Sequence, residues 1–116
     1  MSSLRPAASL AAGRKYSDWV NRDPVFARDG WGCAVPGCSS RRNLHDHHLL
    51  FRSHGGNNGR DNRVTVCAAH HLHGIHAGRI RAWGTAPDDV TWELGVRRGR
   101  RPLLRLRGDR YVSCRA

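Results

Sequence analysis

Four of the eight histidines in this chain fall within one stretch, LHDHHLLFRSHGG, which covers residues 44–56. His47 and His48 are adjacent, so on an extended strand their side chains point to opposite faces. One imidazole could then bind a metal ion while the other takes part in acid–base chemistry, because histidine titrates near neutral pH. The pair is therefore a candidate site for metal-assisted acid–base chemistry.

The cysteines indicate a second candidate site. Four residues separate Cys33 from Cys38, and two residues separate Cys67 from His70. Two pairs at such spacings can close a tetrahedron of thiolate and imidazole ligands around Zn²⁺. Four protein ligands leave no open position, so this zinc would be structural. Cys114 stands apart from both pairs and is expected to be a free thiol.

Short elements must position these residues. The sequence predicts a helix over 24–30, strands over 44–51 and 62–66, and a helix from after Cys67 to near Gly78. In the last part of the chain, apolar and polar residues alternate over 90–96 and again over 104–107. Two alternating runs around a turn predict a C-terminal β-hairpin, whose outer face would be rich in arginine.

Residues 28 to 78, approximately, resemble the HNH endonucleases. The resemblance is carried by adjacent histidines at a strand end (LHDHHLL), a Gly-Gly loop, and an Asn and a Cys-x2-His-His in DNRVTVCAAHH. It implies a ββα-metal fold, in which a β-hairpin packs on a helix around one metal ion. We therefore expect an α+β protein with a small zinc-stapled ββα-metal (HNH or His-Me finger) core and a C-terminal β-hairpin.

The resemblance also implies a role for each residue of the motif. His48 matches the general base that takes a proton from the attacking water, and His47 matches a catalytic-metal ligand at a position that is often Asp. Asn62 matches the residue that orients the base or binds the metal. His71 matches a second metal ligand, and His70 matches the position that is often the fourth cysteine of the zinc site.

His76 is a candidate third ligand of the catalytic metal. Members of the family often carry a further histidine one turn after the helix histidine, but here His76 comes five residues after His71. On a regular α-helix that spacing turns the side chain about 140° away. His76 can join the site only if the helix is distorted, and Gly74 could permit that. His45 and His54 are expected on the surface.

The charge of the chain favours a polyanionic partner. It has 20 Lys and Arg against 9 Asp and Glu, a formal net charge of +11, and arginine suits bidentate phosphate contacts. The candidate phosphate-binding residues are Arg41, Arg42, Arg52 and His54. With the resemblance, these features predict a metal-dependent endonuclease that hydrolyses DNA phosphodiesters with largely sequence-independent affinity. RNA is a less expected substrate.

One structural Zn²⁺ and one catalytic divalent metal are expected. Imidazole ligands favour Mn²⁺, Zn²⁺, Ni²⁺ or Co²⁺, while substrate oxygens also permit Mg²⁺. The alternative is a non-catalytic zinc-knuckle module that binds nucleic acid. That alternative explains the charge and the cysteines equally well, but not the joint presence of His47, His48, Asn62 and His71.

A chain of 116 residues suits one small domain. We expect a disordered segment over 1–15, the nuclease core over 16–80, and over 81–116 an extension packed on that core. Cysteines interleaved with histidines favour a reducing compartment. No apolar run approaches the ~20 residues of a membrane span. A cytoplasmic protein of bacterial or phage type is therefore expected.

Overall fold

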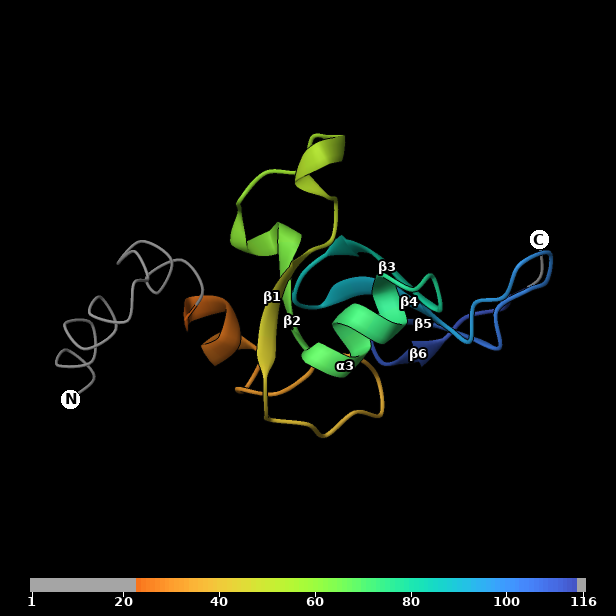
Figure 1. Ribbon diagram of the computed structural model, residues 1–116, viewed down its shortest axis with the longest axis horizontal. Coiled ribbons are helices and arrows are strands. Elements are labelled where there is room, and N and C mark those ends of the chain that lie inside the picture. The colour runs from red at the N-terminus through yellow and green to blue at the C-terminus, as the bar shows by residue number, and fades with distance from the viewer. Residues whose placement is uncertain (1–22, 115–116) are drawn as a thin grey trace, which may run out of the picture.

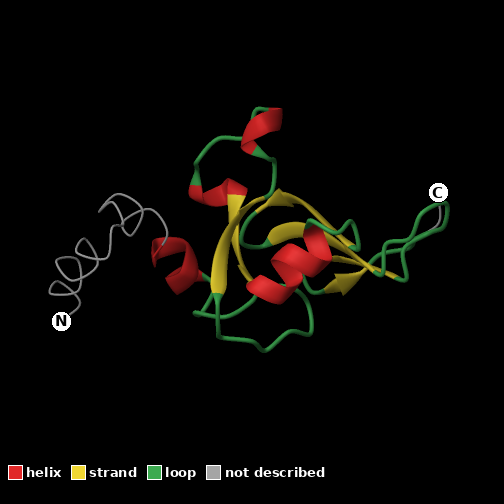
Figure 2. Cartoon of the chain, viewed as in Figure 1, coloured by secondary structure: helices red, strands yellow, loops and turns green. Residues whose placement is uncertain are grey.

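The computed structural model describes residues 23–114 (Figure 1). They form a small α+β fold with two antiparallel sheets and few helical segments (Figure 2). This confirms the α+β class that the sequence predicts. The segment expected to be disordered, 1–15, lies outside the described residues. A helix at residues 23–28 precedes the first sheet and agrees with the predicted helix over 24–30.

The first sheet is a pair of strands, β1 (Leu44–His48) and β2 (Arg63–Cys67). Its register places Leu44 opposite Cys67 and His48 opposite Arg63. Every position of β2 is buried, which is why β-branched residues fill its centre. On β1 only His47 is buried. The sheet therefore turns one imidazole of the adjacent pair inward.

The predicted strand 44–51 is too long, because β1 ends at His48. Beyond it, the backbone N–H of Leu50 donates to Oδ1 of Asn62 at 2.9 Å, and Nδ2 of Asn62 donates to the Leu50 carbonyl at 3.0 Å. One backbone bond follows the paired residues, from the Leu49 N–H to the Asn62 carbonyl at 2.8 Å, and the Asn62 side-chain amide then takes the place of a backbone partner for Leu50. The loop that follows contains two short 3-10 helices, η2 (Arg52–His54) and η3 (Arg60–Asn62).

The Gly-Gly pair lets this loop close on itself. A Cβ at Gly56 would collide with the carbonyl oxygen of Leu50, so only glycine permits this approach of two backbone segments. The backbone N–H of Gly56 also donates to the carbonyl of Phe51 at 2.9 Å. The loop after His48 is therefore held together at Gly56 and at Asn62, the last residue of η3.

The predicted helix after Cys67 is present but irregular. It begins as α3 (Ala68–His70) and continues as the π-helical turn η4 (His71–Ile75). The backbone N–H of His76 donates to the carbonyl of His71 at 3.0 Å, five residues earlier. Gly74 is buried in this turn, and a Cβ there would lie 2.6 Å from Cδ1 of Ile80. The absence of a side chain at Gly74 therefore leaves room for the Ile80 side chain to pack against this turn.

The second sheet has four strands in the order β3 (Ile80–Thr85), β4 (Asp89–Leu94), β5 (Leu104–Arg107) and β6 (Arg110–Tyr111). The predicted C-terminal hairpin is its central pair, β4 and β5, so the extension is larger than a hairpin. The sequence did not predict β3. Only Ile80 is buried among the residues of this strand, and its apolar and polar side chains alternate only weakly.

Both sheets contribute to one hydrophobic core. Val64 and Val66 of β2 pack with Ile80 of β3 and with Val90 and Trp92 of β4. Cys33 and Cys67, two of the candidate metal ligands, belong to the same cluster. The second sheet therefore supports the segment that carries the histidines. None of the helices within residues 23–114 has the length and hydropathy needed to cross a bilayer.

Candidate metal centres

The first centre is formed by Cys33, Cys38, Cys67 and His70, whose ligand atoms lie within 4.8 Å of one another. Nδ1 of His70 is 3.4 Å from Sγ of Cys67 and 3.7 Å from Sγ of Cys33. A zinc tetrahedron with Zn–S near 2.3 Å and Zn–N near 2.0 Å has edges of about 3.5–3.8 Å. The four residues lie close together, as expected, and could bind a metal ion.

The surroundings of Cys33 and Cys67 shift the pKa values of the two thiols in opposite directions. Burial raises the pKa of Cys33 to about 12. Burial also opposes a thiolate at Cys67, but hydrogen bonds from the His70 backbone and from the thiols of Cys33 and Cys38 outweigh it and lower the Cys67 pKa. Cys67 is therefore the cysteine of this centre whose environment favours the deprotonated form that binds a metal ion.

The second centre is formed by His47, His71 and His76, whose ring nitrogens lie within 4.8 Å of one another. His47 comes from β1, His71 begins η4, and His76 directly follows η4. The Nε2 atoms of His71 and His76 are 3.1 Å apart. Two imidazoles on one cation with M–N near 2.1 Å have their nitrogens about 3.0–3.4 Å apart. The His71–His76 spacing matches this value, and His47 lies close enough for the three residues to bind one metal ion.

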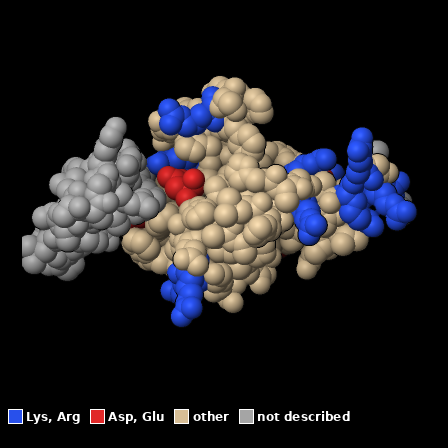
Figure 3. All heavy atoms as spheres, viewed as in Figure 1, with Lys and Arg blue, Asp and Glu red and all other residues tan. Residues whose placement is uncertain are grey.

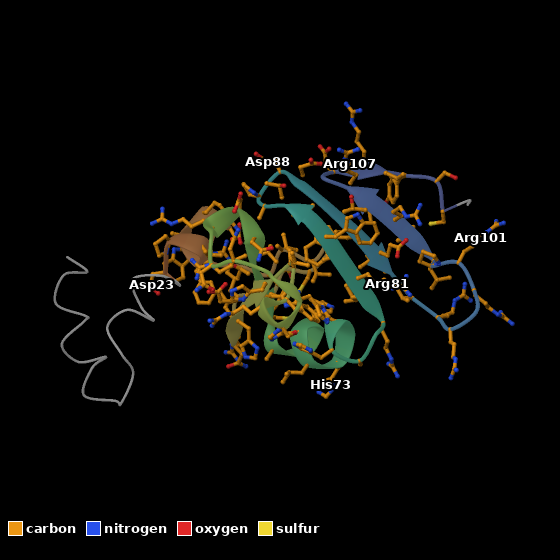
Figure 4. All side chains as sticks on the ribbon, turned by 90° about the horizontal axis from the view of Figure 1, so that it is seen from above. Asp23, His73, Arg81, Asp88, Arg101 and Arg107 are labelled. Atoms are coloured by element: carbon orange, nitrogen blue, oxygen red, sulfur yellow. The ribbon has the colours of Figure 1, made fainter. Side chains whose placement is uncertain are left out.

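The π-helical turn explains why His76 reaches this group. A regular helix would carry it to another side, but in η4 the closing hydrogen bond joins residues five apart, so His71 and His76 lie on the same face. The ring of His76 stacks on Phe51, with centroids 6.0 Å apart. His73, by contrast, is exposed on the outer side of the turn (Figure 4).

His45 is a residue whose place the sequence reasoning missed. It was expected on the surface, but it is half-buried, and its Nδ1 lies 2.8 Å from Nδ1 of His71. When Nε2 of a neutral His71 offers its lone pair to a cation, the ring carries its proton on Nδ1, and His45 can accept that proton. The signal was present in the sequence, because His45 and His47 share one face of β1.

Burial keeps two of the three rings neutral. It lowers the pKa of His47 to about 4, and repulsion from His71, His76 and His48 adds to the effect. It also lowers the pKa of His71 to about 4, with further contributions from His76 and His45. Only a neutral imidazole offers a lone pair to a cation, so both rings are in the metal-binding state at neutral pH.

His48 points away from this group on β1 and meets a loop residue. Its Nε2 lies 2.9 Å from Oδ1 of Asn58. Because an amide oxygen only accepts, the neutral His48 ring carries its proton on Nε2, and its Nδ1 has the free lone pair. Asn58 lies in a loop whose sequence indicates only turns, and no spacing rule pointed to it.

The resemblance predicts that Asn62 orients the base or binds the metal. In the structure its amide bonds instead to the backbone of Leu50, as described above, and to the carbonyl of Asn57 at 2.9 Å. These contacts fix the loop that carries Asn58. The geometry thus places Asn58, rather than Asn62, against the ring of His48.

The histidines open into one cavity of about 380 Å³. Its lining residues come from β1, η2 and η4 and the residues beside them: Asp46, His47, His48, Phe51, Arg52, Ser53, His71 and His76. The predicted phosphate contact Arg52 is thus beside the centre, whereas His54 lines an adjacent cavity. Arg41 and Arg42 are exposed before the start of β1, at the end of the strand opposite to His48.

Both centres depend on the same short elements. The first brings Cys67 and His70, at the start of the helical segment, to Cys33 and Cys38, and the second brings that segment to β1 through imidazoles. Such an arrangement can hold two cations with different surroundings: one enclosed by four protein ligands, and one open to a cavity on the surface. No known protein family matches the chain, and neither a curated protein nor a solved structure is similar to it.

Proposed function

We propose that this protein is a metal-dependent HNH-type endonuclease that hydrolyses DNA phosphodiester bonds. One observation carries the proposal: the imidazoles of His47, His71 and His76 converge, and His48 opens into the same cavity with a free ring nitrogen. A structural cluster of histidines has no need of a fourth, oriented imidazole beside it. A hydrolytic site needs both parts.

The donor set fits a divalent cation. Three nitrogen ligands suit Mn²⁺, Zn²⁺, Ni²⁺ or Co²⁺, and they leave coordination positions for phosphate and water oxygens. A cation held there supplies positive charge where the leaving 3′-oxygen becomes negative. The low pKa of His47 and of His71 supports this role, because protons compete little for their lone pairs above pH 5.

His48 is proposed as the general base. Its Nδ1 takes a proton from a water molecule whose oxygen attacks phosphorus, and the bond from phosphorus to the 3′-oxygen breaks as the new bond forms. Asn58 holds the opposite nitrogen and so fixes the tautomer that can accept a proton. Arg52 lines the same cavity, and its proposed role is to pair with a non-bridging phosphate oxygen.

Besides Arg52 at the histidine cavity, a basic loop elsewhere on the molecule supports a nucleic-acid partner. The loop between β4 and β5 extends from the body, and its residues 95–103 include no acidic side chain. Its four exposed arginines are Arg97, Arg98, Arg100 and Arg101. Figure 3 shows basic side chains gathered at this end of the molecule, and Arg101 lies well away from His73 of the helical turn (Figure 4). A long polyanion could reach both surfaces, whereas a small anion could not.

The experiment that tests this function compares the unmodified protein with His48→Ala on supercoiled plasmid. If the protein is a nuclease, His48→Ala no longer cleaves the plasmid but keeps its zinc content and still retards DNA in gels. The rival, a zinc-knuckle module that binds nucleic acid without cutting it, predicts retardation by both proteins and cleavage by neither. His73→Ala is the matched control, since it removes an exposed histidine from the same turn.

A further inference from the structure

A second cavity adjoins the histidine centre. Its volume is about 300 Å³, and it runs along the free edge of β3, beside the loop that follows β1. His47 and Phe51 line both this cavity and the one that holds the catalytic candidates. Ligand pockets of ~300–1,000 Å³ accept small organic molecules. This one lies at the lower limit, a size suited to a single planar ring system.

The walls of this cavity carry exposed apolar surface. Trp83 is 45% exposed and Leu50 is 52% exposed, although both are large hydrophobic residues. Phe51 is braced by His54, whose ring stacks on it with centroids 5.8 Å apart. An exposed indole beside a rigid aromatic wall is a surface on which a flat aromatic ligand can stack.

The charge at the rim favours an anionic ligand. Among the described residues, no Asp or Glu lines this cavity, and Arg81 does. The Arg81 side chain is 64% exposed, and its partner Glu93 lies 3.5 Å away. Glu93 is already held by two nitrogens of Arg105, at 2.6 and 2.9 Å. Arg81 can therefore turn to a phosphate without leaving a buried carboxylate unpaired.

We propose that this cavity binds one unstacked nucleobase of a nucleic-acid strand, which stacks on Trp83 while a neighbouring phosphate lies at the histidine centre. This inference rests on the proposed function and deepens it. A base inside a regular duplex is stacked on both faces and cannot enter. The preferred substrate is therefore single-stranded DNA, or a duplex that is nicked, frayed or otherwise distorted near the bond that is cut.

Binding by the full chain with His48→Ala, zinc retained and no other metal added, tests the proposal without cleavage. The probes are a short labelled oligothymidylate, a strand of equal length and charge whose internal positions are abasic, and a duplex of the same length. The base-containing strand should bind roughly tenfold more tightly than the abasic strand. Equal affinity for the two strands, or tighter binding of the duplex, would overturn the proposal.

Substitutions at Trp83 then locate the effect. Trp83→Ala should remove the preference for the base-containing strand, and Trp83→Phe should keep most of it. Trp31→Ala is the matched control, because Trp31 is 42% exposed but does not line this cavity. A preference for the base-containing strand that survives Trp83→Ala overturns the proposal. The proposal is also overturned if the DNA-free protein self-associates and Trp83→Ala abolishes that self-association, since a second copy of the chain would then occupy the cavity.

The outcome is separable from that of the nuclease experiment. A base preference that depends on Trp83, in a protein that never cuts DNA, would support the cavity and refute the hydrolytic function. Cleavage that depends on His48 with no base preference would do the reverse. Thermal melting and zinc analysis of each Trp83 variant show whether it is folded, and an exposed side chain is expected to be replaceable.

Discussion

Nε2 of His71 and Nε2 of His76 lie 3.1 Å apart, although five positions separate the two residues in the chain. A single π-helical turn brings them together, and the buried Gly74 within it leaves room for Ile80. π-Bulges occur frequently at functional sites, where they re-aim a side chain. Here the turn brings a third imidazole to the pair formed by His47 and His71.

His45 should tune the affinity of this centre. His45→Ala removes the acceptor for Nδ1 of His71, so the ring loses its fixed tautomer and orientation. Losing such an outer partner typically lowers metal affinity 10–100-fold. Titration of the zinc-loaded protein with Ni²⁺ measures the change, and His73→Ala should leave the affinity unchanged. Unaltered affinity in His45→Ala would mean that His45 does not orient His71.

Asn58 should control the base. Asn58→Ala frees the His48 ring, and we expect DNA cleavage to slow roughly tenfold while DNA binding persists. Asn58→Asp keeps an acceptor and adds a charge that stabilises the imidazolium. Its cleavage rate should therefore rise with pH only at a higher pH than in the unmodified protein. Identical pH–rate profiles for the three proteins would exclude a role of Asn58 at His48.

The cysteine centre should be structural. Cys38→Ser removes one of its four ligands, and a loss of about 2–3 kcal/mol would lower the melting temperature by at least about 10 °C. Cys114 is a free thiol outside the cluster, so Cys114→Ser should melt like the unmodified protein. Calorimetry together with zinc analysis measures both. Equal melting temperatures for the two variants would show that no cation stabilises the fold at this centre.

Acid should destabilise the protein through its buried histidines. The unfolded chain binds protons at His47 and His71 below about pH 6.5, whereas the folded protein binds them only near pH 4. The free energy of unfolding therefore falls as the pH falls from 6.5 to 4, by about 3 kcal/mol for His47 alone. Urea unfolding across this range, with no added metal at the histidine centre, measures the slope.

The control for the pH prediction is a double variant, His47→Asn with His71→Asn, which lacks both titrating rings. Its stability should decline less steeply over the same pH range, because protonation no longer favours its unfolded state at these positions. Other acid-labile groups, such as the cysteine centre, affect both proteins equally. Parallel curves for the two proteins would contradict neutral, buried imidazoles at these positions.

The sequence predicted which residues form the two candidate centres better than it predicted the backbone geometry that brings them together. Paired Cys and His spacings identify Cys33, Cys38, Cys67 and His70, because few other arrangements use such ligands at such intervals. Strand alternation correctly separates His47 from His48. Both patterns depend on the spacing of residues close together in the chain, which can be read directly from the sequence.

What the sequence could not predict depends on contacts between distant segments. The π-helical turn at Gly74 reflects packing against Ile80, and nothing in HLHGI specifies it. Asn58 reaches His48 only because Asn62 and Gly56 fold the intervening loop back on β1. β3 pairs with β4, but most of its side chains are exposed, so the usual alternation is absent.

The most direct test of the central claim is cleavage of supercoiled plasmid by the purified protein in separate reactions with Mg²⁺, Mn²⁺, Ni²⁺, Co²⁺ and Zn²⁺. We predict that nicked or linear DNA accumulates with at least one of these cations. We also predict that His48→Ala and His71→Ala abolish this cleavage while His73→Ala retains it. Plasmid that stays supercoiled with every cation, or that is cut equally by His48→Ala, would contradict a nuclease built on these histidines.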